Sequence, residues 1–208
     1  MLTISIISEK GGVSKTTLTL NFAYYLYQNR YRVAVIDTDQ QQNLTNFLAD
    51  RIDERKEYFC DCYQKDYLNK FDELKKEYDF VLIDTAPKIS SELSKIIDLS
   101  TVSFLLLKVS QLDFYTIQNV INIANSLKQK NKINVLFTQV NQYQHKLKAE
   151  AEKTIKENFN VTVLKNFMSY SNEYINSAAE FRTVFETKTK KKAAEIQLIL
   201  NEVMRVQR

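Results

Sequence analysis

Five short apolar runs recur along the 208-residue chain, and a sixth, weaker run follows them. The five are nearly continuous rather than alternating in polarity, which is typical of strands that are buried on both faces of a parallel sheet. They cover residues 4–7, 33–36, 80–83, 103–109 and 133–137, and the sixth covers residues 161–164. We therefore expect a central, mostly parallel β-sheet.

The stretches between these runs carry apolar residues at helical spacing. In residues 65–77, for example, Leu68, Phe71 and Leu74 fall on one face of a helix. The predicted helices are 16–29, 65–77, 90–98, 114–129, 145–158, 172–181 and 188–206. Because strands and helices alternate, the pattern predicts an α/β fold with crossover helices on both faces of a twisted sheet. No linker-like segment or repeat interrupts residues 1–208, so we expect one domain.

Composition narrows the class of protein. The chain has no apolar stretch of about 18 residues, and its first residues lack the basic start and long apolar run of a signal peptide. We expect a cytoplasmic protein. Cys60 and Cys62 are too close to bridge each other, and the only histidine, His145, is far from them in sequence. Both cysteines are predicted to be reduced and structural.

The positive charge is concentrated at one end of the chain. The net charge is +4, and residues 182–208 carry seven positively and three negatively charged side chains, which leaves residues 1–181 neutral. This asymmetry indicates either an acidic partner or simply a solvated, lysine-rich start of the last helix. Sequence alone leaves both interpretations open.

The last predicted helix also has an apolar stripe, formed by Ile196, Ile199, Leu200 and Val203. Such a stripe either packs on its own domain or binds a membrane surface. The stripe has no aromatic anchors and few basic residues flank it, which favours packing on the domain.

The chain has only two glycines, and both lie in EKGGVSKTT, residues 9–17, between a predicted strand and a predicted helix. Glycine allows a close approach of backbone N–H groups to a ligand and permits positive φ angles. Lys15 would supply a positive charge to the β- and γ-phosphates, and the Thr16 hydroxyl would ligate Mg²⁺. The segment therefore predicts a phosphate-binding loop at the positive end of a helix.

The usual G-x-x-x-x-G-K-[ST] spacing is absent here, but K-G-G-x-x-K-T-T is present. This box resembles the deviant Walker A motif of the ParA/MinD superfamily of ATPases, whose additional signature lysine corresponds to Lys10. Ser14 stands where relatives usually have glycine. The resemblance implies a P-loop NTPase-like fold with ATP and Mg²⁺ as cofactors. The ATP-binding residues it implies in this box are Lys10, Gly11, Gly12, Val13, Ser14, Lys15, Thr16 and Thr17.

Two further segments extend the resemblance. IDTDQQQN (36–43) resembles the family's D-x-D-P-Q-x-N switch, with Gln40 in place of the usual proline. FVLIDTAP (80–87) resembles a Walker B strand that delivers Asp84 to Mg²⁺. The resemblance implies that Asp39 positions the attacking water, that Lys10, Lys15 and Asp39 are catalytic, and that Thr16, Asp84 and Asp39 form the metal site.

The segments after the next two strands complete the predicted nucleotide site. KVSQLDF (108–114) resembles a segment of small ParA proteins in which the aspartate, here Asp113, contacts nucleotide across a dimer. FTQVN (137–141) lies where relatives contact adenine, which makes Thr138, Gln139 and Asn141 weaker candidates. The chain starts at the loop-forming strand, so it is most similar to short, ParF-like partition ATPases without an N-terminal helix-turn-helix extension.

The resemblance implies an ATP-driven homodimer in which Lys10 reaches the partner's phosphates. Hydrolysis would be slow and would be stimulated by a ParB-like partner. The ATP state would bind duplex DNA without sequence preference, would associate with the nucleoid and would segregate plasmid or chromosomal DNA. The DNA-binding candidates are Lys188, Lys190, Lys191, Lys192 and Arg182, with Lys146 and Lys148 as second choices.

Other roles in the same superfamily remain alternatives. One is a MinD-like ATPase on a membrane, and another is a ParA-like ATPase that positions a protein assembly. An iron–sulfur reductase would need cluster cysteines near the dimer interface, and a small-molecule ligase would need a substrate motif; the sequence shows neither.

Overall fold

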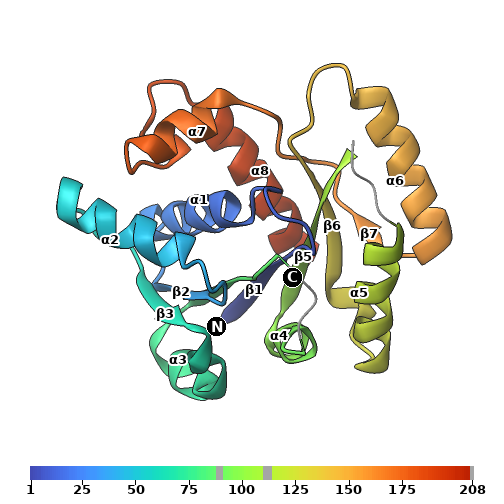
Figure 1. Ribbon diagram of the computed structural model, residues 1–208, viewed down its shortest axis with the longest axis horizontal. Helices are drawn as coiled ribbons and strands as arrows, with labels where there is room; N and C mark the ends of the chain where they lie inside the picture. The colour runs from blue at the N-terminus through green and yellow to red at the C-terminus, as the bar shows by residue number, and fades with distance from the viewer. Residues whose placement is uncertain (88–90, 110–113, 207–208) are drawn as a thin grey trace.

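The structure, a computed structural model, describes residues 1–87, 91–109 and 114–206. Its centre is a seven-stranded sheet in the order β3-β2-β4-β1-β5-β6-β7, and all neighbouring strands run parallel (Figure 1). The strands are β1 (Leu2–Ile7), β2 (Val33–Asp37), β3 (Asp61–Gln64), β4 (Phe80–Asp84), β5 (Val102–Lys108), β6 (Ile133–Thr138) and β7 (Thr162–Val163). The six predicted strands are confirmed.

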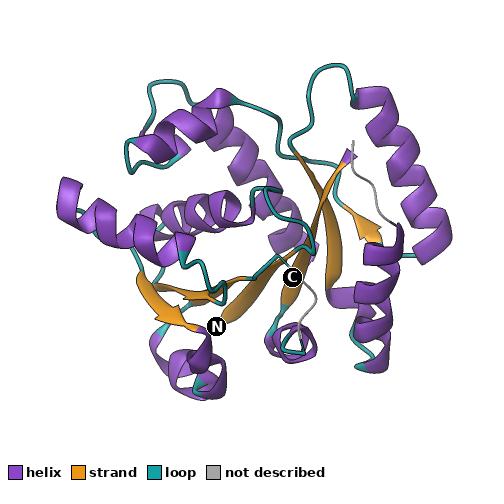
Figure 2. Cartoon of the chain, viewed as in Figure 1, coloured by secondary structure: helices purple, strands orange, loops and turns teal. Residues whose placement is uncertain are grey.

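Helices cover both faces of this sheet, which confirms the predicted α/β architecture (Figure 2). They are α1 (Lys15–Gln28), α2 (Asn43–Arg55), α3 (Phe71–Glu77), α4 (Leu93–Leu99), α5 (Phe114–Ser126), α6 (His145–Phe159), α7 (Asn172–Ala179) and α8 (Lys191–Val206). Short 3₁₀ turns lie at Lys65–Asn69, Lys130–Lys132 and Val184–Glu186. Helices α1, α2, α7 and α8 pack on one face, and α3, α4, α5 and α6 pack on the other.

The last helix is part of the core. Ile196, Ile199, Leu200 and Val203 are each at most 2% exposed and pack in one cluster with the apolar side chains of α1 and of the central strands. The prediction that this stripe packs against its own domain is confirmed. None of the helices in the described part of the chain combines the length and apolar character required to cross a membrane.

Two elements were not predicted, α2 and β3. Helix α2 buries Leu44, Leu48 and Arg51 at helical spacing, a pattern that the polar residues around it obscure. Strand β3 lies at the edge of the sheet and its four residues DCYQ are only partly buried, so it lacks the apolar run of an inner strand. It includes Cys62, while Cys60 just precedes it; both thiols are free, as predicted.

Parallel strands place their carboxyl ends at a common edge of the sheet, where open α/β sheets bind ligands. Asp37 at the end of β2 is the register neighbour of Asp84 at the end of β4. Thr38, the next residue, donates through both its backbone N–H and its hydroxyl to the carbonyl oxygen of Asp84, each at 3.0 Å. The segments that carry the sequence motifs therefore meet at this edge.

Candidate functional site

The connection between β1 and α1, residues 8–14, forms a loop that we call the glycine loop. Gly12 has φ +66° and Ser14 has φ +70°, both in the left-handed region that side chains disfavour. Position 14 therefore has a conformation that glycine adopts more readily than serine. At Gly11, an added Cβ would meet no atom of the described residues within 4 Å beyond its chain neighbours, so packing does not demand glycine there.

The glycine loop is bound from the side by the end of β6. The Thr138 hydroxyl donates to the carbonyl oxygen of Val13 at 3.0 Å. The Gln139 side-chain amide donates to the carbonyl oxygen of Gly12 at 2.6 Å and to the Ser14 hydroxyl at 3.0 Å. Thr138 is fully buried. Burial of Thr138 differs from the expectation that it contacts adenine, whereas Gln139 lines the large cleft beside the loop and its predicted contact with adenine stays a prediction.

The motif lysines lie in different surroundings. Lys15 is 8% exposed, and its ammonium lies 3.4 Å from the carbonyl oxygen of Lys10. Burial lowers the pKa of Lys15, although the carboxylates of Asp84 and Asp39 oppose that shift. Lys10 lies beside a separate small cavity that Lys108 also lines. Lys15 thus lines the large cleft beside the glycine loop, whereas Lys10 lines a different cavity, next to residues of β5.

Asp84 and Thr16 form a buried polar pair at the start of α1. The Thr16 hydroxyl donates to Asp84 Oδ2 at 2.6 Å. Asp84 Oδ1 is buried and has no hydrogen-bond partner among the described residues. Burial raises the pKa of Asp84 to about 7; the Thr16 hydrogen bond lowers it and the charge of Asp37 raises it further. An orphaned carboxylate oxygen beside a threonine hydroxyl fits Mg²⁺, which prefers hard oxygen ligands and keeps several waters.

The two aspartates of the switch segment have different roles. Asp37 is 3% exposed and accepts hydrogen bonds from the backbone N–H of Asp39, at 3.0 Å, and from the N–H and hydroxyl of Thr45, at 3.1 and 3.0 Å. It therefore fixes the start of α2. Asp39 is partly exposed, and within the described part of the chain its carboxylate accepts one hydrogen bond, from the N–H of Gln41 at 3.0 Å. Of the two, Asp39 is the one that remains available to a ligand.

A cleft of about 620 Å³ lies over the glycine loop. Its floor and one wall come from predicted motif residues, including Lys15, Thr16 and Asp39. The opposite wall, which the sequence analysis missed, comes from the segment after β7 and from α7. The residues that line this cleft are Gly11, Gly12, Val13, Ser14, Lys15, Thr16, Thr17, Asp39, Gln41, Asn43, Pro87, Gln139, Met168, Ser169, Tyr170, Ser171, Tyr174, Ile175 and Ala178.

Helix α8 holds that opposite wall in place. The Glu195 carboxylate accepts from the N–H of Ser169 at 2.8 Å, from its hydroxyl at 2.7 Å and from the Tyr174 hydroxyl at 2.8 Å. Further along the same helix, Glu202 binds the backbone N–H groups of Lys165 and Asn166. No sequence motif marks these two glutamates, whose contacts lie 21 to 37 residues away in sequence.

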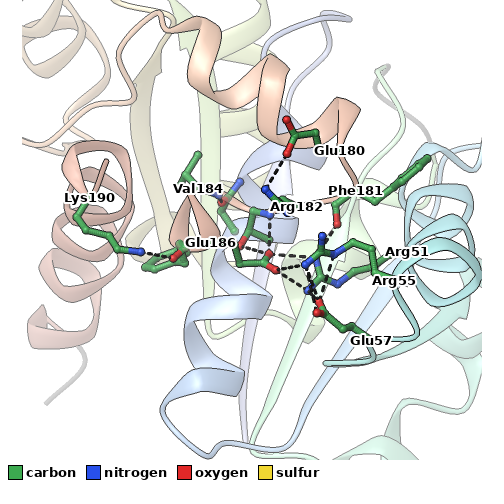
Figure 3. A network of polar contacts seen from close by, with 12 residues as sticks. Arg51, Arg55, Glu57, Glu180, Phe181, Arg182, Val184, Glu186 and Lys190 are labelled. Carbon is green, nitrogen blue, oxygen red and sulfur yellow. Dashed lines mark hydrogen bonds and ion pairs between the residues drawn. The ribbon is translucent and has the colours of Figure 1, made fainter. Parts of the chain in front are cut away.

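A buried arginine connects α2 to the segment between α7 and α8 (Figure 3). The Arg51 side chain is 2% exposed, and its guanidinium contacts both oxygens of Glu186, at 2.8 and 3.0 Å, and the carbonyl oxygen of Phe181, at 2.6 Å. It also bonds Glu57 at 2.6 Å and lies over the ring of Phe59. Helix α2 follows the switch segment, and α7 lines the cleft. Arg51 therefore links α2 to the segment that follows α7 and so stabilises the elements on both sides of the cleft.

The candidate DNA-binding residues are not equally exposed. Lys188, Lys190 and Lys191 are exposed, although the Lys190 ammonium donates to the carbonyl oxygens of Phe185 and Thr187. Arg182 is partly exposed and pairs with Glu180 at 2.8 Å. The five candidates therefore do not form one uniform surface.

Two of the basic candidates are buried rather than displayed. Lys192 is 8% exposed and its ammonium contacts the Ser169 hydroxyl and Glu195, so it supports the cleft wall. Lys148, a second choice, is also 8% exposed; it pairs with Glu152 at 3.2 Å and lies 5.3 Å from the ring centre of Phe167. Both differ from the expectation of exposed lysines, because each ammonium is bound within the fold.

Three other predicted positions are not among the described residues that line the cleft. Asp113 lies outside the described residues. Asn141 and Lys146 are both exposed, and neither lines the cleft. The Asn141 amide oxygen instead accepts from the N–H of Tyr143 at 2.9 Å, so it serves the turn after β6.

The model of the CobQ/CobB/MinD/ParA nucleotide binding domain matches residues 4–184, which is most of the chain. The chain belongs to this family. The match supports the predicted ParA/MinD resemblance and, with it, NTPase activity in general.

Solved structures of this superfamily share the fold. The MinC:MinD complex of Aquifex aeolicus is similar at TM-score 0.74 and 17% identity, with 99% of this chain and 95% of that chain covered. A Borrelia burgdorferi B31 protein assigned to plasmid partition, bound to AMPPNP, gives TM-score 0.75 and 18% identity, with 98% of each chain covered. The ATP complex of a Cyanothece McdA variant gives TM-score 0.76 and 15% identity, with 98% of this chain and 96% of that chain covered.

A relative by sequence is more limited in extent. An uncharacterized protein of Methanocaldococcus jannaschii is 49% identical over 45 residues, which cover 22% of this chain and 17% of that protein. The match therefore spans only a small part of that relative's length and carries no functional assignment.

Proposed function

We propose that this chain is a ParA-type partition ATPase that binds ATP with Mg²⁺ in the glycine-loop cleft and forms a homodimer in that state. The dimer binds duplex DNA without sequence preference, and a ParB-like partner stimulates slow hydrolysis. The protein acts in the cytoplasm, associates with the nucleoid in its ATP state and segregates plasmid or chromosomal DNA.

The observation that carries the nucleotide assignment is the pair formed by Thr16 and Asp84. A buried carboxylate oxygen without a partner is costly unless a ligand satisfies it. It lies next to a hydroxyl and a buried lysine, Lys15, whose charge suits phosphate. Mg²⁺ held by Thr16 and Asp84 would neutralise charge that develops on the transferring phosphoryl group.

Slow hydrolysis agrees with the lining of the cleft. Asp39 is the one carboxylate among the described residues that line it, and no histidine or glutamate does so. Asp39 would orient a water molecule without being a strong base, so the chemistry depends on positioning and on added positive charge. Lys10 is not among the described residues that line this cleft and instead lines a separate small cavity with Lys108 and Thr116, which is compatible with a role on the phosphates of a partner subunit.

The DNA assignment rests on the exposed lysines at the start of α8. Lys188 and Lys191 are exposed within a region that carries the whole net charge of the chain. Exposed lysines close to the N-terminal end of α8 suit contacts with DNA phosphates that do not depend on base sequence. A MinD-like role on a membrane is less well supported, because the apolar stripe of α8 packs inside the domain and is not available to a lipid surface.

The decisive experiment measures two properties of the purified protein. Binding of a fluorescent ATP analogue, with and without Mg²⁺, tests the nucleotide site. Fluorescence anisotropy of a random-sequence duplex, titrated in ATP–Mg²⁺ and in ADP–Mg²⁺, tests the DNA switch. We expect duplex binding with ATP only and weaker binding at higher salt. Nucleotide binding without duplex binding would retain the ATPase and reject the DNA-based role.

A further inference from the structure

Two residues that lie side by side in the candidate site adopt the left-handed backbone conformation, although neither is glycine. Ser14, in the glycine loop, has φ +70°, and Gln139, directly after β6, has φ +54°. A side chain makes this conformation unfavourable, so it persists only where surrounding contacts enforce it. The contact between them is direct, since the Gln139 amide donates to the Ser14 hydroxyl at 3.0 Å.

The same part of β6 also binds two consecutive carbonyl groups of the loop. Gln139 binds the carbonyl oxygen of Gly12 and Thr138 binds that of Val13. A trans peptide unit points its carbonyl and its N–H in opposite directions, and the described chain has no cis peptide bonds. The N–H groups of Val13 and Ser14 are therefore directed away from β6. Backbone N–H groups held in a common direction are what a phosphate group requires.

We propose that Gln139 is a positioning residue for the glycine loop. Its hydrogen bond to Ser14 holds the loop in the conformation that binds phosphate. A glycine at position 14 would reach positive φ without help. Ser14 adopts the same positive φ while its hydroxyl accepts a hydrogen bond from the Gln139 amide. The serine in the loop and the glutamine 125 residues away thus form a matched pair. This inference rests on the proposed nucleotide binding.

The pairing makes a quantitative prediction for a double-mutant cycle. Without Gln139, the loop adopts the binding conformation in only a fraction of the molecules. The apparent association constant for nucleotide is then the intrinsic constant multiplied by that fraction. Q139A should weaken binding of a fluorescent ATP analogue, and the loss should be at least about threefold smaller in the S14G background, an ordinary effect for one hydrogen bond. The bond from Gln139 to Gly12 is lost in both backgrounds, so it cancels in the cycle.

Two comparisons separate this role from recognition of the base. The loss caused by Q139A should be the same for the ATP analogue, for a GTP analogue and for inorganic tripolyphosphate, measured by competition. A loss for ATP alone would mean that Gln139 contacts the base and would overturn the proposal. Q144A is the matched control, because Gln144 lies on the same connection and its side chain accepts a bond from the N–H of Asn141, not from the glycine loop; it should bind nucleotide like wild type.

The nucleotide-free protein provides an independent measurement. S14G should raise the midpoint of thermal unfolding of Q139A by about 2–4 °C more than it changes that of wild type, since in Q139A it only relieves strain. Equal shifts in both backgrounds, together with equal losses of affinity, would overturn the proposal. If wild type bound no nucleotide, the proposed function would fail, whereas this unfolding cycle would still decide whether Gln139 braces Ser14.

Discussion

The hydroxyl of Thr16 lies 2.6 Å from Asp84 Oδ2, and it joins the start of α1 to the end of β4 across 68 residues of sequence. Asp84 Oδ1 is left buried without a hydrogen-bond partner in the described part of the chain. The site thus holds one satisfied and one unsatisfied oxygen on the same carboxylate. A metal ion bound with nucleotide would satisfy the second oxygen, which is why the proposed Mg²⁺ site is placed at this pair.

Replacing this carboxylate tests the metal assignment. D84N keeps the shape of the side chain but removes its charge, so Mg²⁺ should no longer strengthen binding of an ATP analogue. We expect ATP hydrolysis to fall at least about tenfold, the lower range for losing a group that holds a metal. Nucleotide titrations with and without Mg²⁺ measure this effect. D72N, on an exposed ion pair with Lys75, is the control and should behave like wild type.

The pH dependence of the same group has a defined sign. Burial raises the pKa of Asp84 to about 7 in the folded, nucleotide-free protein, while an aspartate in the unfolded chain titrates near about 4. The folded state therefore binds more protons between about pH 4 and 7, and the contribution of Asp84 to the unfolding free energy falls as the pH rises through that window. Mg²⁺ competes with this proton, so the Mg²⁺ effect on nucleotide affinity should increase as the pH is raised through about 7. A flat profile that D84N leaves unchanged would contradict this assignment.

The buried ion pair of Arg51 and Glu186 is predicted to be essential to the fold. Burial raises the pKa of Glu186, but its bonds to Arg51 and Thr183 outweigh that effect and hold the pKa below its usual value. R51M removes the closest positive partner of this buried carboxylate, leaving only the longer contact with Arg55 at 3.4 Å, and should lower the unfolding free energy by about 3 kcal/mol, the low end for breaking a buried ion pair. Denaturant titration measures this loss.

Two comparison variants sharpen the test. R32M removes an arginine of similar geometry from an exposed pair with Asp79 and should change stability little. The double variant R51M/E186Q removes both charges and should recover part of the loss. If R51M and R32M proved equally mild, the network in Figure 3 would have no special role in stability.

How much of the fold the sequence predicts depends on the range of the interactions. The inner strands and the glycine loop are encoded locally, by apolar runs and by two glycines, so they were predicted. Strand β3 was not, since DCYQ becomes a strand only by pairing with β2. Likewise, α2 is anchored by Arg51, whose partners lie as far as 135 residues away in sequence.

The candidate site divides in the same way. Its glycine-loop side follows a motif, so the sequence predicts that Lys15, Thr16 and Asp84 lie together, as they do. The opposite wall has no motif, because Ser169 and Tyr174 are placed by Glu195 on a different helix. A sequence pattern also does not show whether a side chain is buried. The lysine-rich pattern therefore predicts Lys192 as a DNA contact, although its ammonium is bound within the fold.

Lys10 is expected to act on hydrolysis rather than on binding. If it reaches the phosphates of a second subunit, K10A should bind an ATP analogue with nearly wild-type affinity and lose most ATP turnover, because charge that matters only in the transition state is removed. Steady-state turnover and equilibrium titration on the same samples separate the two effects. K153A, on the exposed face of α6, is the control. Undiminished turnover in K10A would reject the role across subunits.

The exposed lysines beside α8 give the sharpest test of DNA binding. Each lysine that contacts a phosphate releases counterions, so its removal should reduce the slope of log affinity against log salt by about 1. We expect this for K188A and K191A in ATP–Mg²⁺, with duplex anisotropy as the measurement. K192A should instead lower the thermal unfolding midpoint, because its ammonium supports Ser169 and Glu195. A salt slope that K188A and K191A leave unchanged, with K153A as reference, would place the DNA contact on another surface.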